Sequence, residues 1–530
     1  MKTLQKGPFL GINNRRPDFA LHVDKTGDFL REAENVDIDN TGNLRRRKSA
    51  SLIQAMTGGH SLFTAGDGVR YLVRDLVLYV VTLPSYSETL FKILSSNAPI
   101  SYAEFNGSLY YSNGTDSGRI KAGVWYPWAM PTPDAPSVAS LSGGELFSGW
   151  YQVAVSYFNN VTGEEGGVSP SSNYELSAVG GLRVTLPGST SGATHVKVYV
   201  STVNGSAPML AKTVAIGTST VDVTLQAELM IGIDAIQRFE KPLPAGSQLF
   251  IHKGALCSVK DKVIYEGIPF KPGYCIAVES GIPFPSDVSN AVPVNDGVYV
   301  VADKTYFFPG PAMTKVEGVI PVVLPYGGVK GTVFSSPNKT LHGWFGNKGF
   351  VIAGASGEVE AVMSDNIDLT PPASGVSAVF ETDGYRRVVA CGWCLNIDNL
   401  AATQYTDYAF TSISENYGTK ADGIYDLASD GAVPYVVGIG RENFGSEMKK
   451  ALPAVYVGVD SEEPMQLRVR TENGDEYFYG ARSCGGGMRN HRIDPGKGLR
   501  ENWYDLALVG ESYFKQASVS FAPINSSRRI

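Results

Sequence analysis

The sequence repeats one short pattern, in which a β-rich run, a tight turn and a second β-rich run with aromatic residues follow one another. Most of the turns contain Gly beside Asn or Asp, the residues that tolerate the positive φ of a hairpin turn. The turns are at Asp67-Gly68, Asn106-Gly107, Lys260-Asp261, Asp296-Gly297, Asn347-Lys348-Gly349, Asp383-Gly384 and Asp430-Gly431. All intervals but one are close to the roughly 40 to 50 residues of a four-stranded propeller blade. The pattern predicts an all-β chain that contains a β-propeller of six or seven blades.

The composition agrees with many short strands joined by turns. The chain of 530 residues has 59 Gly and 30 Pro, and only 18% of its residues are charged. Long amphipathic helices need more charged residues than this, so few helices are expected.

The one long interval, between Asn106-Gly107 and Lys260-Asp261, requires an insertion. Prolines at positions 127, 131, 133 and 136 precede it, and a Lys-Pro-Leu-Pro sequence at 241–244 follows it. Between them, five runs alternate apolar and polar residues over the length of a strand. The runs are 149–159, 181–187, 194–203, 209–217 and 219–225. We therefore expect residues 134–232 to form an inserted β-sandwich of the immunoglobulin or fibronectin type.

The remaining segments are assigned around this insert. Residues 51–133 and 233–452 are expected to be the first and second parts of the propeller. After Pro453, strand patterns interrupted by the glycine run 485–487 predict a separate C-terminal β domain at 453–530. Residues 1–50 are expected to form a strand or hairpin segment that closes the propeller.

The segment before residue 50 contains a hairpin pattern that also resembles a calcium loop. Val36, Ile38 and Leu44 alternate with charged residues around an Asn-Thr-Gly turn at 40–42. Asp37 and Asp39 match the first ligands of an EF-hand loop, but the twelfth position, which must be a carboxylate, is Lys48. A hairpin is therefore predicted, and no metal site.

The basic run Arg45-Arg46-Arg47 has two interpretations. It could neutralise the phosphates of a nucleic acid, or its guanidinium groups could pair with carboxylates of this chain or of a neighbouring subunit. Residues 1–50 and 465–530 each carry ten Lys and Arg against seven Asp and Glu, which gives each segment a net charge of +3. Because the whole chain has a net charge of −7, residues 51–464 carry a net charge of −13. An acidic body does not hold DNA electrostatically, so pairing with carboxylates is the favoured interpretation.

Several short motifs stand at the start, in the middle and near the end of the chain. Those at the start are Gly11 to Arg16, Ala33 to Asp39, the turn at 40–42 and Leu44 to Arg47. Further motifs are Pro244 to Gly246, Pro495 to Gly498 and Trp503 to Leu506. Together these motifs resemble the tail nozzle proteins of short-tailed bacteriophages, also called tail tubular protein B. One departure is Lys48-Ser49, where the family often has Pro-Gly.

The resemblance implies a structural virion protein. Six copies would form a ring below the tail adaptor, around a channel that retains and then releases genomic DNA. Such a protein assembles in the host cytoplasm into the virion tail, contacts tail fibre or spike proteins, and does not insert stably into a membrane. Residues 1–50 could then dock on the adaptor, and the candidate subunit or adaptor contacts are Arg15, Arg16, Arg45, Arg46, Arg47, Arg528 and Arg529.

No catalytic or cofactor motif supports an enzyme. The sequence lacks a nucleophile elbow, a phosphate-binding P-loop, a zinc-protease motif and the repeated boxes of propeller sialidases. Cys391 and Cys394 have the spacing of a redox or zinc motif but follow a strand pattern, and the five cysteines are expected to be reduced. The aromatic pairs 110–111, 125–126 and 307–308 are expected in the core. The alternative function is a tail protein that binds or depolymerises carbohydrate on the host surface.

Overall fold

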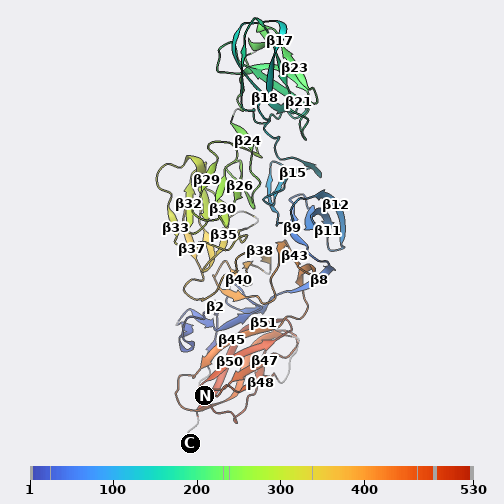
Figure 1. Ribbon diagram of the computed structural model, residues 1–530. Coiled ribbons are helices and arrows are strands. Elements are labelled where there is room, and N and C mark those ends of the chain that lie inside the picture. The colour runs from blue at the N-terminus through green and yellow to red at the C-terminus, as the bar shows by residue number, and fades with distance from the viewer. Residues whose placement is uncertain are drawn as a thin grey trace. The chain divides into compact units, whose positions relative to one another are not determined.

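The computed structural model describes residues 4–525, except residues 24, 231, 238, 337, 339, 383, 462 and 482–485. Nearly all regular structure in these residues is β-strand, with three short 3-10 helices, η1 (Asp18–Ala20), η2 (Gln226–Met230) and η3 (Met313–Lys315). The prediction of an all-β chain is confirmed. The chain divides into two compact units, of which the first contains Met1–Ile93, Tyr299–Tyr306 and Val322–Ile530, and the second contains Leu94–Val298 and Phe307–Pro321. Many of their strands are labelled in Figure 1.

Small antiparallel sheets, most of them four-stranded with strands in sequence order, recur along the chain. In the first unit these are β9 (His60–Thr64), β10 (Arg70–Arg74), β11 (Val77–Thr82) and β12 (Ser87–Ile93), and then β34 (Phe334–Ser335), β35 (His342–Gly346), β36 (Gly349–Ala353) and β37 (Val359–Ala361). The second unit has β13 (Ser101–Phe105), β14 (Ser108–Ser112), β15 (Ser117–Lys121) and β16 (Val124–Tyr126), and then β25 (Gln248–His252), β26 (Ala255–Lys260), β27 (Val263–Tyr265) and β29 (Gly281–Pro283). Another sheet has the order β30 (Asn290–Val294), β31 (Gly297–Val301), β32 (Thr305–Pro309), β33 (Val322–Leu324).

Two further groups of four strands belong to this series. The strands β38 (Ser377–Thr382), β39 (Tyr385–Ala390), β40 (Trp393–Asn396) and β41 (Ala402–Gln404) are the first four of a nine-stranded sheet. The strands β42 (Ser412–Ser414), β43 (Tyr417–Lys420) and β44 (Gly423–Ser429) form a sheet that is completed by β8 (Ser49–Ala55) from the start of the chain. The series therefore ends on a sheet that combines strands from both ends of the sequence.

The first strand of one small sheet bonds to the first strand of the next within each unit. In the first unit, the backbone N–H of Leu62 on β9 donates to the hydroxyl of Ser412 on β42 over 2.8 Å. In the second unit, the N–H of Leu249 on β25 donates to the hydroxyl of Ser101 on β13 over 2.9 Å. Gln248 exchanges two hydrogen bonds, of 2.8 and 2.9 Å, with the backbone of Ala291 on β30. Short polar side chains on the first strands thus join consecutive sheets.

The region predicted as an insert has two sheets around a core of its own. One sheet has the order β17 (Ser137–Leu146), β20 (Gly180–Thr185), β23 (Thr220–Val223), and the other has β19 (Ser172–Leu176), β18 (Gly149–Phe158), β21 (His195–Val200), β22 (Met209–Ala215). Buried residues from both sheets, including Val153, Leu182 and Val198, form one cluster. All five predicted strand runs are present, whereas β17 and β19 were not predicted, because their apolar residues do not alternate clearly.

Two large sheets complete the first unit. The nine-stranded sheet continues from β41 with β5 (Glu32–Glu34), β45 (Tyr435–Glu442), β50 (Tyr504–Gly510), β47 (Gln466–Arg470) and β48 (Glu476–Gly480). The six-stranded sheet has the order β49 (Arg489–Ile493), β46 (Lys450–Ser461), β51 (Phe514–Asn525), β7 (Leu44–Arg46), β6 (Val36–Ile38), with β1 (Leu4–Lys6) also paired to β51. The remaining strands are β2 (Phe9–Ile12), β3 (His22–Val23) and β4 (Gly27–Leu30) in the first unit, and β24 (Glu240–Pro242) and β28 (Tyr274–Ile276) in the second.

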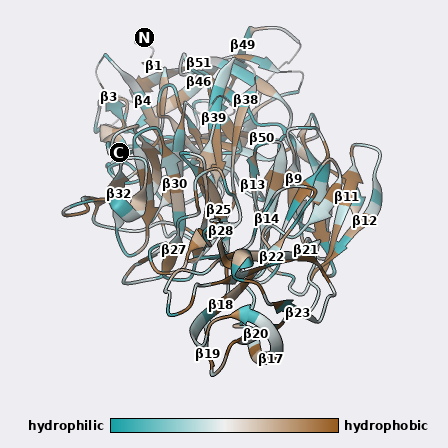
Figure 2. Cartoon of the chain, turned by 90° about the horizontal axis from the view of Figure 1, so that it is seen from above, coloured by the Kyte–Doolittle hydropathy of each residue, from teal (hydrophilic) through white to brown (hydrophobic). Residues whose placement is uncertain are grey.

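Strands from the start of the chain are thus part of the same sheets as strands from its end. β1 and β7 both pair with β51, and β5 pairs with β45, which precedes residue 453, where the C-terminal domain was expected to begin. Apolar residues of these strands, among them Val36, Leu44, Val437 and Phe521, form one buried cluster, and hydropathy along the strands can be followed in Figure 2. The turn predicted at Asp430-Gly431 is not a hairpin between two strands of one small sheet, since it connects β44 to β45.

Candidate functional site

The predicted hairpin is present, and its aspartates, Asp37 and Asp39, accept hydrogen bonds from other groups of the chain. β6 and β7 are antiparallel, with Val36 opposite Arg46 and Ile38 opposite Leu44. The Asp39 carboxylate accepts hydrogen bonds from the Thr41 hydroxyl, over 2.6 Å, and from the backbone N–H groups of Thr41 and Asn43, over 2.9 and 3.0 Å. Burial would raise the pKa of Asp39, but these bonds hold it below the usual value. This carboxylate therefore stabilises the turn. Among the described residues no group of three His, Cys, Asp or Glu side chains could hold a metal ion.

Asp37 lies in a buried network of aromatic and polar side chains. It is 3% exposed and accepts a hydrogen bond from the hydroxyl of Tyr385 over 2.9 Å and another from the hydroxyl of Tyr405. The Nε atom of Arg387 is 3.8 Å from Oδ2 of Asp37. Burial alone would lower the pKa of Arg387, but the Asp37 carboxylate holds this pKa well above its usual value. Burial raises the pKa of both tyrosines, and Asp37 raises it further. The network keeps a buried charge paired.

Arg46 is buried and binds backbone oxygens. Its side chain is on β7 and the residue is 2% exposed. Its Nη1 donates to the backbone oxygen of Gly431 over 2.5 Å and to that of Glu511 over 3.0 Å. Burial lowers the pKa of Arg46, and the nearby Asp430 opposes this effect. The guanidinium joins three segments that are far apart in the sequence.

Arg47 is buried in the same region, at 6% exposure. Its Nε donates to the Oδ1 atom of Asn35 over 2.8 Å, and its two other nitrogens donate to the backbone oxygens of Lys48, over 2.9 Å, and Thr406, over 3.1 Å. Its guanidinium carbon is 5.1 and 5.2 Å from the ring centroids of Tyr405 and Tyr408. The expected partners of Arg46 and Arg47 were carboxylates of this chain or of a neighbouring subunit. The observed partners are backbone oxygens, an amide and aromatic rings of the same chain.

The other arginines predicted as contacts differ in exposure. Arg45 is partly buried, and its guanidinium carbon lies 5.3 Å from the ring centroid of Tyr385. Arg15 and Arg16 are exposed, and Arg15 has one weak ion pair, at 3.8 Å, with the exposed Asp368. Arg528 and Arg529 lie outside the described residues. Of the predicted contacts that the structure describes, Arg15 and Arg16 are the ones available to a partner.

The cysteines of the described residues are free thiols. Cys391 and Gly392 form a two-residue hairpin turn between β39 and β40, with φ of 54° and 76°. Burial raises the pKa of Cys257 and of Cys391 to about 12, so both are protonated near neutral pH. The motif at 391–394 is therefore a hairpin with inert thiols. Cys484 lies outside the described residues.

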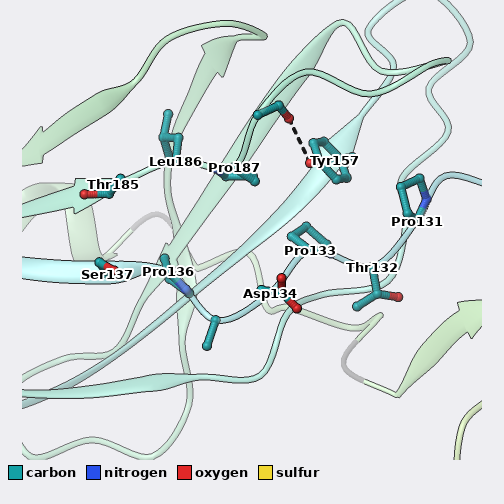
Figure 3. A pocket seen from close by; sticks show the side chains of 12 residues that line it. Pro131, Thr132, Pro133, Asp134, Pro136, Ser137, Tyr157, Thr185, Leu186 and Pro187 are labelled. Atoms are coloured by element: carbon teal, nitrogen blue, oxygen red, sulfur yellow. Dashed lines mark hydrogen bonds between the residues drawn. The ribbon is translucent and has the colours of Figure 1, made fainter.

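One cavity of the second unit, of about 400 Å³, is lined by residues 131–137, 157 and 185–188. Figure 3 shows its prolines, Asp134 and the hydroxyl of Tyr157, which donates to the backbone oxygen of Gly188 over 2.8 Å. Asp134 is the single carboxylate among the described residues that line it. The other polar side chains of its described lining, those of Thr132, Ser137, Tyr157 and Thr185, are uncharged, so the lining offers no cation to a ligand.

A second cavity of the same unit, of about 510 Å³, has more polar groups in its lining. Arg119 and Lys121 on β15, Tyr126 on β16 and Glu164 all contribute to it. The hydroxyl of Tyr274 donates to Oε1 of Glu164 over 3.0 Å, and burial, followed by this carboxylate, raises the pKa of Tyr274. Glu164 is the one carboxylate among the described lining residues.

Sequence reasoning missed this second cavity. The pairs at 110–111 and 307–308 are buried as expected, but Tyr126 is 41% exposed, so its assignment to the core was wrong. Arg119 and Lys121 are two residues apart on one strand, and this spacing was the sequence signal that could have indicated a basic face. Glu164 belongs to no motif, and only the fold brings it near them.

Comparisons with known proteins give no family. No protein-family model matches the sequence, and no curated protein matches it. Among solved structures, an exo-β-1,3-galactanase from Phanerochaete chrysosporium is 9% identical, with 88% of this chain and 100% of that chain covered and a TM-score of 0.20. A eukaryotic initiation factor is 11% identical, with 67% and 87% covered and a TM-score of 0.21. A sialidase from Trypanosoma rangeli is 10% identical, with 93% and 94% covered and a TM-score of 0.14. At these scores the likenesses assign neither a fold nor a function.

No helix among the described residues is long and apolar enough to cross a membrane.

Proposed function

We propose that this chain is a structural protein of the tail of a short-tailed bacteriophage, where several copies, six by the resemblance, form a nozzle ring around the DNA channel. In this role the chain binds copies of itself and the tail adaptor, retains the genome and then lets it pass, and performs no catalysis. The proposal rests on the motif resemblance and on the use that the fold makes of the motif residues.

The observation that carries the proposal is the position of the motif 33–47. Its residues form β5, β6 and β7, which pair with β45 and β51 and contribute Ala33, Val36 and Leu44 to the main buried cluster. The buried Arg46 and Arg47 bond to the protein itself. A motif whose residues are committed to packing and internal bonds supports an architectural protein more than a catalytic or nucleic-acid-binding one.

The proposed architecture is a β-propeller of seven blades. Outside residues 137–223, the described strands include seven groups of four, in meander order apart from the last, and the last is completed by β8 from the start of the chain. Closure of the last blade by a strand from the other end of the sequence is how a propeller avoids open ends. The hydrogen bonds between consecutive first strands are those expected of innermost strands packed around an axis.

The two sheets of residues 137–223, with one shared core, are proposed to be an inserted β-sandwich, and β45 to β51 with the strands from the start of the chain are proposed to be the C-terminal β domain.

The second candidate function is binding of host carbohydrate, which the cavity at Arg119 and Glu164 favours. Hydrolysis of a glycosidic bond by the common mechanisms needs two carboxyl groups, about 5 to 9.5 Å apart, across the sugar. Each described cavity has one. The second candidate is therefore a binding activity rather than depolymerisation.

Electron microscopy of the purified chain, alone and mixed with the tail adaptor, tests the proposed function. Rings with a central channel that attach to the adaptor are the expected result. Particles of single subunits that do not bind the adaptor, together with release of reducing sugars from host surface polysaccharide, would overturn the proposed function.

A further inference from the structure

The cavity of about 510 Å³ has a floor made by two neighbouring strands. On β15 and β16, Arg119 is opposite Tyr126 and Lys121 is opposite Val124. Residues two apart on a strand share a face, and so do residues directly opposite each other in an antiparallel pair. These four side chains therefore lie on one face, and the Arg119 guanidinium carbon is 5.6 Å from the ring centroid of Tyr126.

Another part of the lining is a loop held in place by its own hydrogen bonds. The Asn159 side chain accepts from the backbone N–H groups of Val161 and Thr162, over 2.9 and 3.1 Å, and donates to the backbone oxygen of Gly192 over 2.7 Å. Glu164 follows this loop, and one of its oxygens is fixed by the hydroxyl of Tyr274. Hydrogen bonds of the chain itself therefore hold this part of the lining in place.

The charged groups of the cavity retain capacity for a ligand. The Nη2 atom of Arg119 is 3.8 Å from Oε2 of Glu164, which is too long for a hydrogen bond. With Lys121 the lining has two cations against one carboxylate, which suits a ligand with a single negative charge.

We propose that this cavity binds an acidic saccharide, through one pyranose ring that carries a carboxylate. The sugar carboxylate accepts hydrogen bonds from Arg119 and Lys121, an apolar face of the ring packs on Tyr126, and a hydroxyl donates to Glu164. The volume lies within the roughly 300 to 1,000 Å³ of small-ligand sites. This inference goes beyond the proposed role in a nozzle ring and does not depend on it.

Single-stranded nucleic acid is the competing ligand class, because it also combines an anion with a ring. A strand requires a basic groove with several stacking aromatics. The described lining has one aromatic side chain and two cations, which is too few for a strand that stacks several bases and carries a phosphate at each step. The saccharide is therefore favoured, and an oligonucleotide enters the test as a rival.

The test begins with the full wild-type chain and a pair of probes that differ in one carboxylate. Methyl β-D-glucuronide and methyl β-D-glucoside are titrated separately, with binding followed by saturation-transfer NMR and calorimetry. The glucuronide should bind at least about tenfold more tightly, since a hydrogen bond to a charged group is worth that factor or more. Its affinity should fall as salt is added. Equal affinity for the two probes, or a ten-residue oligothymidylate that displaces the glucuronide and binds more tightly, overturns the proposal.

Variants then locate the site. Arg119→Gln should weaken glucuronide binding about tenfold or more, whereas Arg183→Gln should not change it. Arg183 is the matched control, because it is an arginine of the same unit that pairs with Asp222 on the neighbouring strand β23 and does not line the cavity. Lys121 is exposed, so Lys121→Gln tests the same prediction in a chain that folds. The proposal is wrong if neither Arg119→Gln nor Lys121→Gln weakens binding more than the control does.

Discussion

Replacement of Arg47 by Ala tests the view that the basic run serves the fold and not a partner. The substitution removes three donors from Asn35, Lys48 and Thr406, and leaves the backbone oxygens of Lys48 and Thr406 inside the protein. It also removes the cation from the rings of Tyr405 and Tyr408.

The expected loss of stability follows from these contacts. Each lost hydrogen bond contributes about 1 kcal/mol, and more where a buried acceptor is left without a donor. The contact with the two rings adds about 1 kcal/mol. Water that enters the vacated space recovers part of the sum. We therefore expect a decrease of about 3 to 4 kcal/mol, which is a large part of the roughly 5 to 15 kcal/mol that stabilises a domain.

The measurement is urea denaturation followed by tryptophan fluorescence, with the midpoint and slope of each transition compared between variants. Lys48→Ala is the control, because Lys48 is the next residue and its ion pair with Asp430 is exposed, so about 0 to 1 kcal/mol should be lost. Arg47→Lys should fall between the two, since a lysine keeps the charge but cannot reach three acceptors in a fork. If Arg47→Ala is no less stable than Lys48→Ala, the structural role assigned to Arg47 is wrong.

Three other predictions follow from the described side chains. Burial raises the pKa of Glu442 in the folded chain, so the contribution of this carboxyl to stability is full below its ordinary pKa of 4.5 and is lost as the pH rises through its pKa in the folded chain. Glu442→Gln should remove this part of the pH dependence of the melting temperature between about pH 4 and pH 7. An unchanged dependence of the melting temperature on pH would contradict this prediction. Because burial raises the pKa of Cys257 and Cys391 to about 12, both thiols should resist iodoacetamide at neutral pH and react in urea, as read by peptide mass mapping; rapid labelling of either thiol in the native chain would contradict the raised pKa. Replacing the exposed Arg15 and Arg16 by Ala should change stability by less than about 0.5 kcal/mol but prevent attachment to the adaptor in sedimentation assays, and normal attachment would remove them from the proposed contact.

Local features of the fold could be predicted from the sequence because their causes are local. Alternation of apolar and polar residues fixed the five predicted strands between 149 and 225, since a strand that buries one face needs that period. The hairpin of β6 and β7 was predicted from the turn residues Asn40 to Gly42, which accept the conformation that the turn requires. The strands β17 and β19 were not predicted, because their apolar and polar residues do not alternate clearly.

Turn chemistry alone did not say which strands a turn connects. Asp430-Gly431 has the residues of a hairpin turn but leads from a small sheet into the nine-stranded sheet. Lys253-Gly254 and Glu415-Asn416, which look less like turns, connect paired strands. The turn residues determine that the chain reverses, and the packing of the strands determines what it pairs with.

The sequence by itself determined that this chain is all-β, that short strands recur through most of its length, and that residues near 134–232 interrupt the series, because composition, period and turn residues act over a few positions. Only the tertiary structure decided that β8 completes the sheet of β42 to β44, that β1 and β7 pair with β51, that Arg46 and Arg47 face inward, and that Arg119 and Glu164 line one cavity. Each of these arrangements joins residues that are distant in the sequence. Their free energies depend on which apolar faces and hydrogen-bonding edges remain uncovered once the local elements have formed, and no local pattern records that.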